Sequence, residues 1–491
     1  MKPKLTVKLF IKLSLFSALL LFFIFRSKAQ DYIPANDSKI RYTGRIDFTD
    51  SLQPRYSFPS VSIKAKFKGS GISAIIHDYG LGDLGTTNYY KVIVDGDIVN
   101  EQLKMNNGKN TYVLTSGLPL SDHTVEIIKI TEGASGVSSF IGFKVDGGEQ
   151  KTLDLPSRPN KKIEFIGDSW TCGYGNLSQF SSGSESMKYS TYVAKNEDNY
   201  YAWGPISARA IGAEFHITAI SGRGLYRNNW DNDNTGDAFG TLPKNYDNIF
   251  EDNSSVSYNH SFHPDIVPIH LGTNDMAAEG ATGESAKLDD DAFQDTYKKF
   301  IDKILGYHPC AKIIICYGNS KSDGYPSWTK QLSRLRTISN NLMALYPNGN
   351  VTDLELPYTA ESWPAKPDDC GYGDAWHPSK CSHQEMSAKL VEKINDMNVD
   401  WGNRENCPSI SLISPITKEE KATIYIYPNP ARNNISLVGE NVEEWKIINQ
   451  LGEVVLKGTE KKINIEAINK GLYYCLSKSE GITSSTKFIK K

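Results

Sequence analysis

The sequence predicts a central α/β domain with a parallel sheet, flanked on each side by a domain of β-strands. Two observations carry this prediction. Between about residues 158 and 402, short apolar runs alternate with amphipathic helical stripes, a pattern typical of a parallel sheet covered on both faces by helices. Residues 31–150 and 422–491 instead show short strand-like runs separated by turn residues. The length of 491 residues fits about three domains of ordinary size.

The composition is that of a globular protein. Hydrophobic residues make up 39% and charged residues 23%, which excludes collagen-like, coiled-coil and wholly disordered chains. A formal net charge of −3 gives no sign of the basic surface that binds nucleic acid, so no nucleic-acid partner is expected. Seven cysteines are too few for a disulfide scaffold.

Residues 1–29 are predicted to be an export signal that is cleaved after Ala29. Six Lys and Arg residues and no acidic residue precede Ala29, and the apolar run at 13–25 is followed by the small-x-small pattern of residues 27–29. The alternative is a membrane anchor, but 13 residues fall short of the roughly 20 that a membrane-spanning helix needs. No other run is apolar enough to span, so no stable membrane span is expected.

Residues 31–150 are predicted to form an antiparallel β-sandwich. Alternating apolar and polar residues mark runs such as VSIKAKF at 61–67 and TVEIIKI at 124–130. Turn signals such as Asp95-Gly96 separate the runs, and no convincing helical stripe lies among them. Such a domain either extends a substrate cleft or supports the fold.

The central domain, at about 158–402, is predicted from buried strands and the helices between and after them. The strand runs lie at 163–166, 215–220, 266–271 and 313–316. Two helical stripes each share one face, and their residues are Phe293, Tyr297, Phe300, Ile301, Ile304 and Leu305, and Met386, Leu390, Val391, Ile394 and Met397. Ligands of open parallel sheets bind at the carboxyl ends of the strands, so the motifs after these runs are candidates for function.

The first candidate is Ser169, in the sequence GDSWT directly after the first strand run. A serine in this turn presents its hydroxyl at the rim of the sheet, next to the N–H donors at the start of a helix. This environment suits a nucleophile whose reaction develops an oxyanion. Taken alone, the same serine is better explained as a helix N-cap.

Two further strand ends offer hydrogen-bond donors. Gly222 lies in SGRG after the second run, where a glycine lets the backbone N–H approach a ligand, and Gly224 is a rival in the same motif. Asn274 lies in GTND after the third run, where its amide is a neutral, directional donor. Each motif alone is also explained by an ordinary turn.

The fourth candidate is the segment DAWHP at 374–378, before the last helix. His377 is positioned to act as general base on Ser169 if the fold brings the two together. Asp374, three residues earlier, is a candidate to accept the Nδ1–H of His377 and to fix its tautomer. An isolated histidine in this place is more commonly structural.

Together, the four segments resemble the four blocks of the SGNH hydrolases, a superfamily of lipases and esterases on a flavodoxin-like α/β sheet. The resemblance covers about residues 160–400. It implies Ser169 as nucleophile and His377 as base, with an oxyanion hole made by the Ser169 N–H, the Gly222 N–H and the Asn274 side chain. Trp170 departs from the usual pattern, in which a smaller residue follows the nucleophile.

Longer stretches are similar to carbohydrate esterase family 2. They are GDSWTCGYGN at 167–176, ISGRGLYRN at 220–228 and WHPS at 376–379. The resemblance implies a jelly-roll domain followed by an SGNH domain over about 32–400, and removal of O-acetyl groups from plant polysaccharides such as xylan and glucomannan. Some members of the family orient the histidine with a backbone carbonyl, so the Asp374 side chain and a carbonyl stay alternatives.

Residues 422–491 are similar to sorting domains of the type IX secretion system. The similarity rests on IYPNP at 426–430, KGLY at 470–473 and the closing KFIKK. It implies that the chain passes through the periplasm, with the secretion machinery as a partner, and ends up secreted or on the cell surface. The segment is therefore expected to be a small β-sandwich sorting domain, and a small carbohydrate-binding β-domain is the alternative. The polar segment 403–421, with two prolines, is predicted to be a linker.

Aromatic residues near the motifs are candidate platforms for a sugar ring: Trp376, Trp328 and Trp230. Packing inside the protein is the alternative for each. No His/Cys cluster has zinc spacing, and DNDNTGD at 231–237 lacks the acidic residue of a calcium loop at its twelfth position, so no metal or cofactor is expected. In an exported protein, Cys370 and Cys381 either pair around His377 or stay free.

The sequence therefore predicts a secreted carbohydrate O-acetyl esterase that uses a Ser-His(-Asp) acyl-enzyme mechanism on an acetylated polysaccharide or oligosaccharide. The alternatives are an SGNH esterase or lipase of other acyl specificity, and a carbohydrate-binding protein with a vestigial esterase site. Loss of the six positive charges of the signal takes the net charge from −3 to −9. An acidic enzyme suits a neutral acetylated polysaccharide better than a polyanion.

Overall fold

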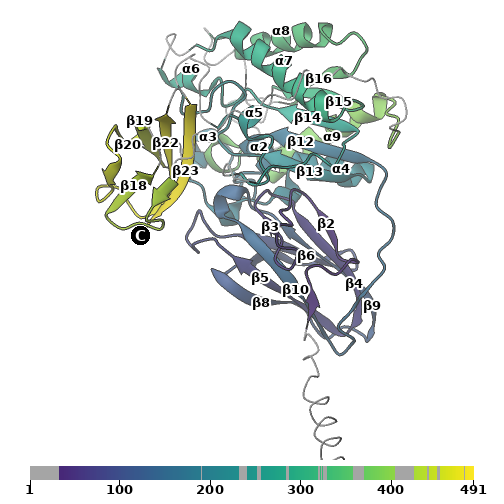
Figure 1. Cartoon of the computed structure of the whole chain (residues 1–491). Helices are drawn as coiled ribbons and strands as arrows, with labels where there is room; N and C mark the ends of the chain where they lie inside the picture. The colour runs from purple at the N-terminus through teal and green to yellow at the C-terminus, as the bar shows by residue number, and fades with distance from the viewer. Residues whose placement is uncertain are drawn as a thin grey trace, which may run out of the picture.

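The structure is a computed structural model with an N-terminal, a central and a C-terminal domain (Figure 1). It describes residues 32–189, 191–231, 240–251, 256–282, 287–318, 321, 323, 329–357, 370–403, 425–438, 442–449, 454–479 and 482–491. The predicted export signal, Trp328 and all of the predicted linker except Asn403 lie outside these residues. Among the helices that the structure describes, none combines the length and the apolar character needed to cross a bilayer.

The N-terminal domain consists of two antiparallel sheets around one apolar core. Its strands are β1 (Ile33–Pro34), β2 (Arg41–Thr43), β3 (Arg55–Tyr56), β4 (Ser62–Gly69), β5 (Gly71–Asp78), β6 (Tyr89–Val94), β7 (Asp97–Lys104), β8 (Gly108–Thr115), β9 (Ser121–Lys129), β10 (Ser138–Asp146) and β11 (Thr152–Leu153). One sheet has the order β1-β10-β5-β8 with β3 beside β10, and the other has the order β11-β4-β9-β6-β7 with β2 beside β4. The antiparallel pairing predicted for this segment is confirmed.

The central domain is built on a parallel sheet with the order β13-β12-β14-β15-β16. Its strands are β12 (Lys162–Gly167), β13 (Glu214–Ala219), β14 (Ile266–His270), β15 (Lys312–Tyr317) and β16 (Val351–Glu355). The first four correspond to the predicted strand runs. The edge strand β16 was not predicted, because its sequence VTDLE contains polar residues and only its first residue is buried.

Helices cover both faces of this sheet. They are α2 (Ser169–Cys172), α3 (Gly183–Ser186), α4 (Trp203–Ile211), α5 (Leu242–Asn245), α6 (Ala277–Thr282), α7 (Asp290–Tyr307), α8 (Gln331–Ala344) and α9 (Lys380–Asp396), with the 3₁₀ turns η1 (Gly133–Ser135), η2 (Met187–Tyr189), η3 (Ala194–Asn196), η4 (Asn199–Tyr201) and η6 (Asp374–Trp376). The apolar sides of α7 and α8 share one core with the sheet, and those of α4 and α9 share the core on the opposite face. On β15, Ile313 and Ile315 face the first core and Ile314 the second, as the two-residue period of a strand requires.

The C-terminal domain consists of two small sheets around its own core and lies beside the central domain (Figure 1, yellow). Its strands are β17 (Tyr425–Tyr427), β18 (Asn434–Val438), β19 (Val442–Ile448), β20 (Val454–Gly458), β21 (Lys462–Asn464), β22 (Gly471–Ser479) and β23 (Ile482–Lys490). One sheet has the order β17-β18-β21, and the other has the order β20-β19-β22-β23. The strand character predicted for this segment is confirmed.

A buried ion pair joins the N-terminal and central domains. The Nη2 of Arg45 lies 3.0 Å from Oε1 of Glu164 on β12, and both side chains are almost fully buried. The Nη1 of Arg45 donates to the carbonyl oxygens of Tyr246 and Asn248 at 2.5 and 2.9 Å. Burial raises the pKa of Glu164, but Arg45 and neighbouring groups act more strongly and lower it to about 2. The domain interface therefore contains a paired charge rather than apolar contacts alone.

Candidate active site

The turn after β12 places Ser169 at the carboxyl end of the sheet. Asp168 caps the short helix α2, because its Oδ1 accepts a hydrogen bond from the N–H of Trp170 at 3.1 Å. Gly167 is needed here, since a Cβ at this position would lie 2.1 Å from Oγ1 and 2.7 Å from Cβ of Thr171. Ser169 thus begins α2, whose first N–H groups have no partner within the helix.

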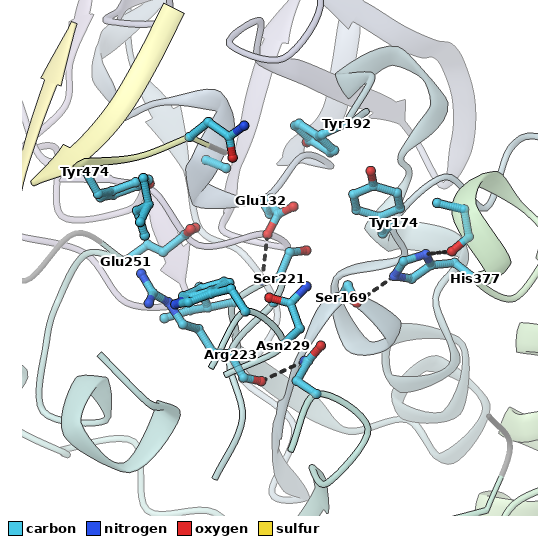
Figure 2. Close-up of a pocket in the computed structure, with 18 residues that line it drawn as sticks. Glu132, Ser169, Tyr174, Tyr192, Ser221, Arg223, Asn229, Glu251, His377 and Tyr474 are labelled. Atoms are coloured by element: carbon cyan, nitrogen blue, oxygen red, sulfur yellow. Dashed lines mark hydrogen bonds between the residues drawn. The ribbon is translucent and has the colours of Figure 1, made fainter. Parts of the chain in front are cut away.

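The structure brings Ser169 and His377 together although they are far apart in the sequence. The Oγ of Ser169 lies 2.7 Å from Nε2 of His377 (Figure 2). On the other side of the ring, Nδ1 lies 3.0 Å from the carbonyl oxygen of Asp374 and 2.9 Å from that of Ala375. With its proton on Nδ1, the ring donates to these carbonyls and leaves Nε2 free to accept the Ser169 proton.

The predicted contact between the Asp374 side chain and His377 is not present. The Asp374 carboxylate instead accepts a hydrogen bond from Nδ2 of Asn196 at 2.8 Å, and the backbone carbonyl faces the ring. The cause is the local backbone, because Ala375 and Trp376 have positive φ values of 47° and 65°. This turn directs two successive carbonyl groups at Nδ1. Of the two alternatives left open by the sequence, the geometry supports the carbonyl.

Aromatic rings enclose the imidazole of His377. Tyr174 stacks on it with ring centroids 4.2 Å apart, and Trp170 lies at 6.2 Å. Burial lowers the pKa of His377, while the Asp374 carbonyl, the Asp168 carboxylate and the Ala375 carbonyl act in the opposite direction without reversing the shift. The neutral imidazole, which a general base requires, is thereby favoured at neutral pH.

Of the predicted oxyanion donors, Gly222 lines the same cavity as Ser169, whereas Gly224 is engaged elsewhere. The N–H of Gly224 donates to Oδ1 of Asn228 at 3.2 Å. A Cβ on Gly224 would lie 1.9 Å from the Arg227 carbonyl oxygen, so this glycine is explained by tight packing. Gly222 has a φ of 75°, a conformation that favours glycine. The geometry therefore favours Gly222 over its rival.

Asn274 also lines the cavity, with its amide held at the wall. Its Nδ2 donates to the Arg223 carbonyl oxygen at 2.8 Å and to Oδ2 of Asp168 at 3.2 Å. Both amide hydrogens are therefore used. The shorter bond, to Arg223, holds the amide in place, and the bond to Asp168 is the longer of the two.

The cavity in front of Ser169 has a volume of about 250 Å³ and is lined by residues from all three domains (Figure 2). The N-terminal domain contributes Glu132 and Ala134. The C-terminal domain contributes Ile448, Asn449 and Tyr474. The central domain contributes the remaining side chains, among them Tyr174, Tyr192, Arg223, Asn229, Trp230 and Glu251. The site is thus shared among the domains rather than confined to the central one.

The three predicted tryptophan platforms have different positions. Trp230 lines the cavity, and the Arg223 guanidinium lies 4.8 Å from the centre of its ring. Trp376 is 46% exposed, packs against Tyr372 and is not part of the cavity wall. Trp328 lies outside the described residues. The structure thus places one of the three against the space in front of Ser169.

The segment that carries His377 is closed by a disulfide between Cys370 and Cys381, as one of the two alternatives from the sequence predicted. Ser379 caps the following helix α9 by accepting from the N–H of Ser382, and its hydroxyl donates to the Cys370 carbonyl oxygen at 2.5 Å. Cys172 and Cys316 are buried and free. These links fix the loop that presents the base.

Several cavity residues were missed by the sequence analysis. Tyr174 and Arg223 stand inside the quoted motifs, so their position next to Ser169 and Gly222 was a usable signal. Glu132 and Tyr474 belong to other domains, and no local pattern marks them. Within the described part of the chain, no group of three or more His, Cys, Asp or Glu side chains is arranged to hold a metal ion.

Comparisons with known proteins agree with this architecture. Family models match three segments: "Carbohydrate esterase 2 N-terminal" at residues 42–156, "GDSL-like Lipase/Acylhydrolase" at 163–390 and "Secretion system C-terminal sorting domain" at 425–491. A protein of Cellvibrio japonicus named acetylxylan esterase / glucomannan deacetylase is 30% identical over 358 residues, which cover 70% of this chain and 86% of that protein. The chain belongs to carbohydrate esterase family 2.

Two further proteins are each similar over 73% of this chain. The cellulase/esterase CelE of Acetivibrio thermocellus is 30% identical over 358 residues, and the match spans 73% of this chain but 39% of CelE. A family two carbohydrate esterase from Clostridium thermocellum, solved in complex with cellohexaose, is 29% identical with a TM-score of 0.60, covering 73% of this chain and 98% of its own. As a family member the chain is a carbohydrate esterase, and its sorting domain marks it for secretion or attachment to the cell surface.

Proposed function

We propose that this member of carbohydrate esterase family 2 removes O-acetyl groups from xylan or glucomannan, with Ser169 as nucleophile and His377 as general base. The observation that carries the proposal is the 2.7 Å contact between Ser169 Oγ and His377 Nε2. A serine is a poor nucleophile unless an adjacent base takes its proton, and the base must be oriented by a third group. The carbonyl oxygens of Asp374 and Ala375 supply that orientation here.

The reaction follows from this arrangement. Ser169 Oγ attacks the acetyl carbonyl carbon while His377 takes the hydroxyl proton. The Ser169 N–H, the Gly222 N–H and Asn274 Nδ2 donate to the tetrahedral oxyanion. His377 then gives the proton to the sugar oxygen, which leaves as an alcohol. Water attacks the acetyl-enzyme with His377 again as base, and acetate is released.

The cavity suits a sugar better than a long acyl chain. Its wall carries the polar side chains of Arg223, Asn229 and Glu251, which can hydrogen-bond to hydroxyl groups, whereas a lipid acyl chain needs an apolar groove. The names of the relatives support the same class, since one is called an acetylxylan esterase / glucomannan deacetylase and another holds cellohexaose. We therefore place an acetylated polysaccharide in this site.

Export by way of the periplasm completes the proposal. The predicted signal at 1–29 would carry the chain across the inner membrane, and the sorting domain at 425–491 would hand it to the type IX machinery. A plant polymer is too large to enter a cell, so an enzyme that acts on it has to be released or displayed outside.

The substrate class is tested by release of acetate from acetylated xylan and acetylated glucomannan, compared with hydrolysis of a long-chain ester such as p-nitrophenyl decanoate. We expect acetate from at least one polymer and little or no hydrolysis of the decanoate. A preference for the long-chain ester, or release from small synthetic acetates alone, would overturn the polysaccharide assignment.

A further inference from the structure

A turn of the N-terminal domain reaches into the active site of the central domain. Residues 130–136, between β9 and β10, place Glu132 in the cavity wall with 1% of its surface exposed. Two hydrogen bonds hold the backbone of this turn: the Nζ of the fully buried Lys129 donates to the carbonyl oxygens of Thr131 and Glu132 at 2.6 and 2.8 Å. The N–H of Glu132 donates to Oε1 of Glu197 at 2.8 Å. The position of Glu132 is therefore fixed through its backbone, by Lys129 of the N-terminal domain and by Glu197 of the central domain.

The Glu132 carboxylate connects the two segments that build the reaction centre. Its Oε2 accepts a hydrogen bond from the N–H of Ser221 at 3.0 Å, and Ser221 directly precedes Gly222. The same oxygen lies 3.5 Å from Sγ of Cys172, on the helix that begins with Ser169. One side-chain oxygen thus holds the nucleophile helix and the Gly222 turn at a fixed separation.

We propose that Glu132 is a positioning residue for the oxyanion hole: by holding the N–H of Ser221, it aims the N–H of Gly222 at the oxygen that becomes negative in the transition state. The inference rests on the function proposed above. It also assigns a role to the N-terminal domain, which supplies a part of the active site as well as support for the fold.

The energetics favour such a role. A buried N–H left without an acceptor costs about 1–3 kcal/mol, so without Glu132 the Ser221 turn would rearrange to find another partner. A rearrangement of a few tenths of an ångström matters here, because an oxyanion donor acts only at about 2.7–3.1 Å from the developing charge. Burial raises the pKa of Glu132, so a neutral amide is a conservative replacement for its side chain.

The same turn also contacts the aromatic residues that pack around His377. The Oγ of Ser135 lies 2.9 Å from the hydroxyl of Tyr192, and the Tyr192 ring packs against Tyr174 with centroids 5.3 Å apart. Tyr174 is the ring that stacks on His377 (Figure 2). The N-terminal domain therefore supports both the oxyanion donors and the imidazole, and Glu132 is the member of the turn that contacts the donor segment directly.

The test compares Glu132→Ala and Glu132→Gln in the full chain, with p-nitrophenyl acetate as substrate and a boronic acid as inhibitor. The boron forms a bond with Ser169 Oγ and becomes tetrahedral and anionic, so its affinity measures the oxyanion hole itself. For Glu132→Ala we expect kcat to fall about 100-fold, the effect of losing one donor, with KM little changed and the inhibitor constant raised by a similar factor. Glu132→Gln keeps an acceptor for Ser221 N–H and should restore most of both losses.

Glu164→Gln is the matched control, because Glu164 is an equally buried carboxylate that does not line the cavity. It should lower the melting temperature while leaving kcat and the inhibitor constant unchanged. If Glu132→Ala does not fold, Glu132→Asp carries the test, since a side chain shorter by one methylene no longer reaches Ser221 N–H.

An unchanged inhibitor constant in the Glu132 variant would overturn the inference, whether kcat is retained or falls, because a smaller folded fraction lowers apparent kcat without altering inhibitor affinity. Ser169→Ala is assayed alongside. Activity retained by Ser169→Ala would contradict the proposed function, whereas an inactive Ser169→Ala together with a normal Glu132→Ala would contradict this inference alone.

Discussion

The Nδ1 atom of His377 lies 3.0 Å from the backbone carbonyl oxygen of Asp374, while the carboxylate of Asp374 accepts a hydrogen bond from Asn196. A carbonyl fixes the tautomer and the orientation of the ring as a carboxylate does, but it carries no full charge to stabilise the imidazolium that forms during the reaction. In the mechanism that we propose, the backbone orients the base of a Ser-His pair, and catalysis depends more strongly on the oxyanion donors.

Asp374→Asn should have a small effect on catalysis. Because the carbonyl of residue 374 is unchanged, we expect kcat within about fivefold of the native value, in contrast to the loss of about 10⁴-fold seen when the carboxylate of a Ser-His-Asp triad becomes an amide. Steady-state kinetics on p-nitrophenyl acetate measure the difference, with His377→Ala as the inactive reference. A loss of 10³-fold or more in Asp374→Asn would show that the side chain acts on the base.

Asn274→Ala should lower kcat by about 100- to 1000-fold, the typical effect of removing one oxyanion donor. The amide is held by the Arg223 carbonyl at 2.8 Å, so it is positioned before substrate arrives. The melting temperature should fall modestly, since the variant also loses the two hydrogen bonds that the amide makes, but the protein should remain folded. Comparable kcat values for variant and native enzyme would remove Asn274 from the oxyanion hole.

On the acid side of the pH profile, the pH at which half of the activity is lost should lie below the ordinary pKa of histidine. As the proposed general base, His377 acts in its neutral form, so activity should be lost as the pH falls through its pKa, which burial lowers from the usual value of 6.5. The profile of kcat/KM should therefore have its acid midpoint below 6.5. Tyr174→Ala, which opens the stacked face of the imidazole to water, should move that midpoint upward. A midpoint at or above about 6.5 in the native enzyme would contradict the assigned environment.

Removal of the C-terminal domain should increase activity on polymers. Asn449 and Tyr474 form part of the cavity wall, so the attached domain restricts the approach of a chain more than that of a small ester. The match to a solved family member covers 73% of this chain and 98% of that member's chain. For a chain ending at Asn403, kcat/KM on acetylated glucomannan should rise severalfold, because the wall formed by Asn449 and Tyr474 is removed. Activity on p-nitrophenyl acetate should be nearly unchanged, and an equal change on both substrates would exclude steric restriction.

Much of the central domain was predictable because its signals are local. Buried strands are continuous apolar runs and helices have one apolar face, so four of the five strands of the sheet were found. The motifs after the first three strand runs indicated Ser169, Gly222 and Asn274, and the segment before the last helix indicated His377. The edge strand β16 was missed because only its first residue is buried. The choice between Gly222 and Gly224 depended on which backbone N–H is already used, and a sequence pattern does not contain that information.

The remaining features depend on contacts between distant segments. Whether the carboxylate or the carbonyl of Asp374 faces His377 is decided by two residues with positive φ, neither of which is a glycine. Glu132 and Tyr474 reach the cavity through the packing of one domain against another. No periodicity or motif spacing in a single sequence indicates such contacts. Trp376 was predicted from its proximity to His377, yet its side chain packs on Tyr372 and is half exposed.

The central claim is that acetyl groups leave the polysaccharide through an acyl-enzyme on Ser169. The most direct measurement is the rate of acetate release from acetylated glucomannan by the native enzyme and by Ser169→Ala at equal folded concentration. We expect steady release by the native enzyme and a loss of about 10⁴-fold or more in the variant, with an unchanged melting temperature. Release by Ser169→Ala at a rate near that of the native enzyme would contradict this claim.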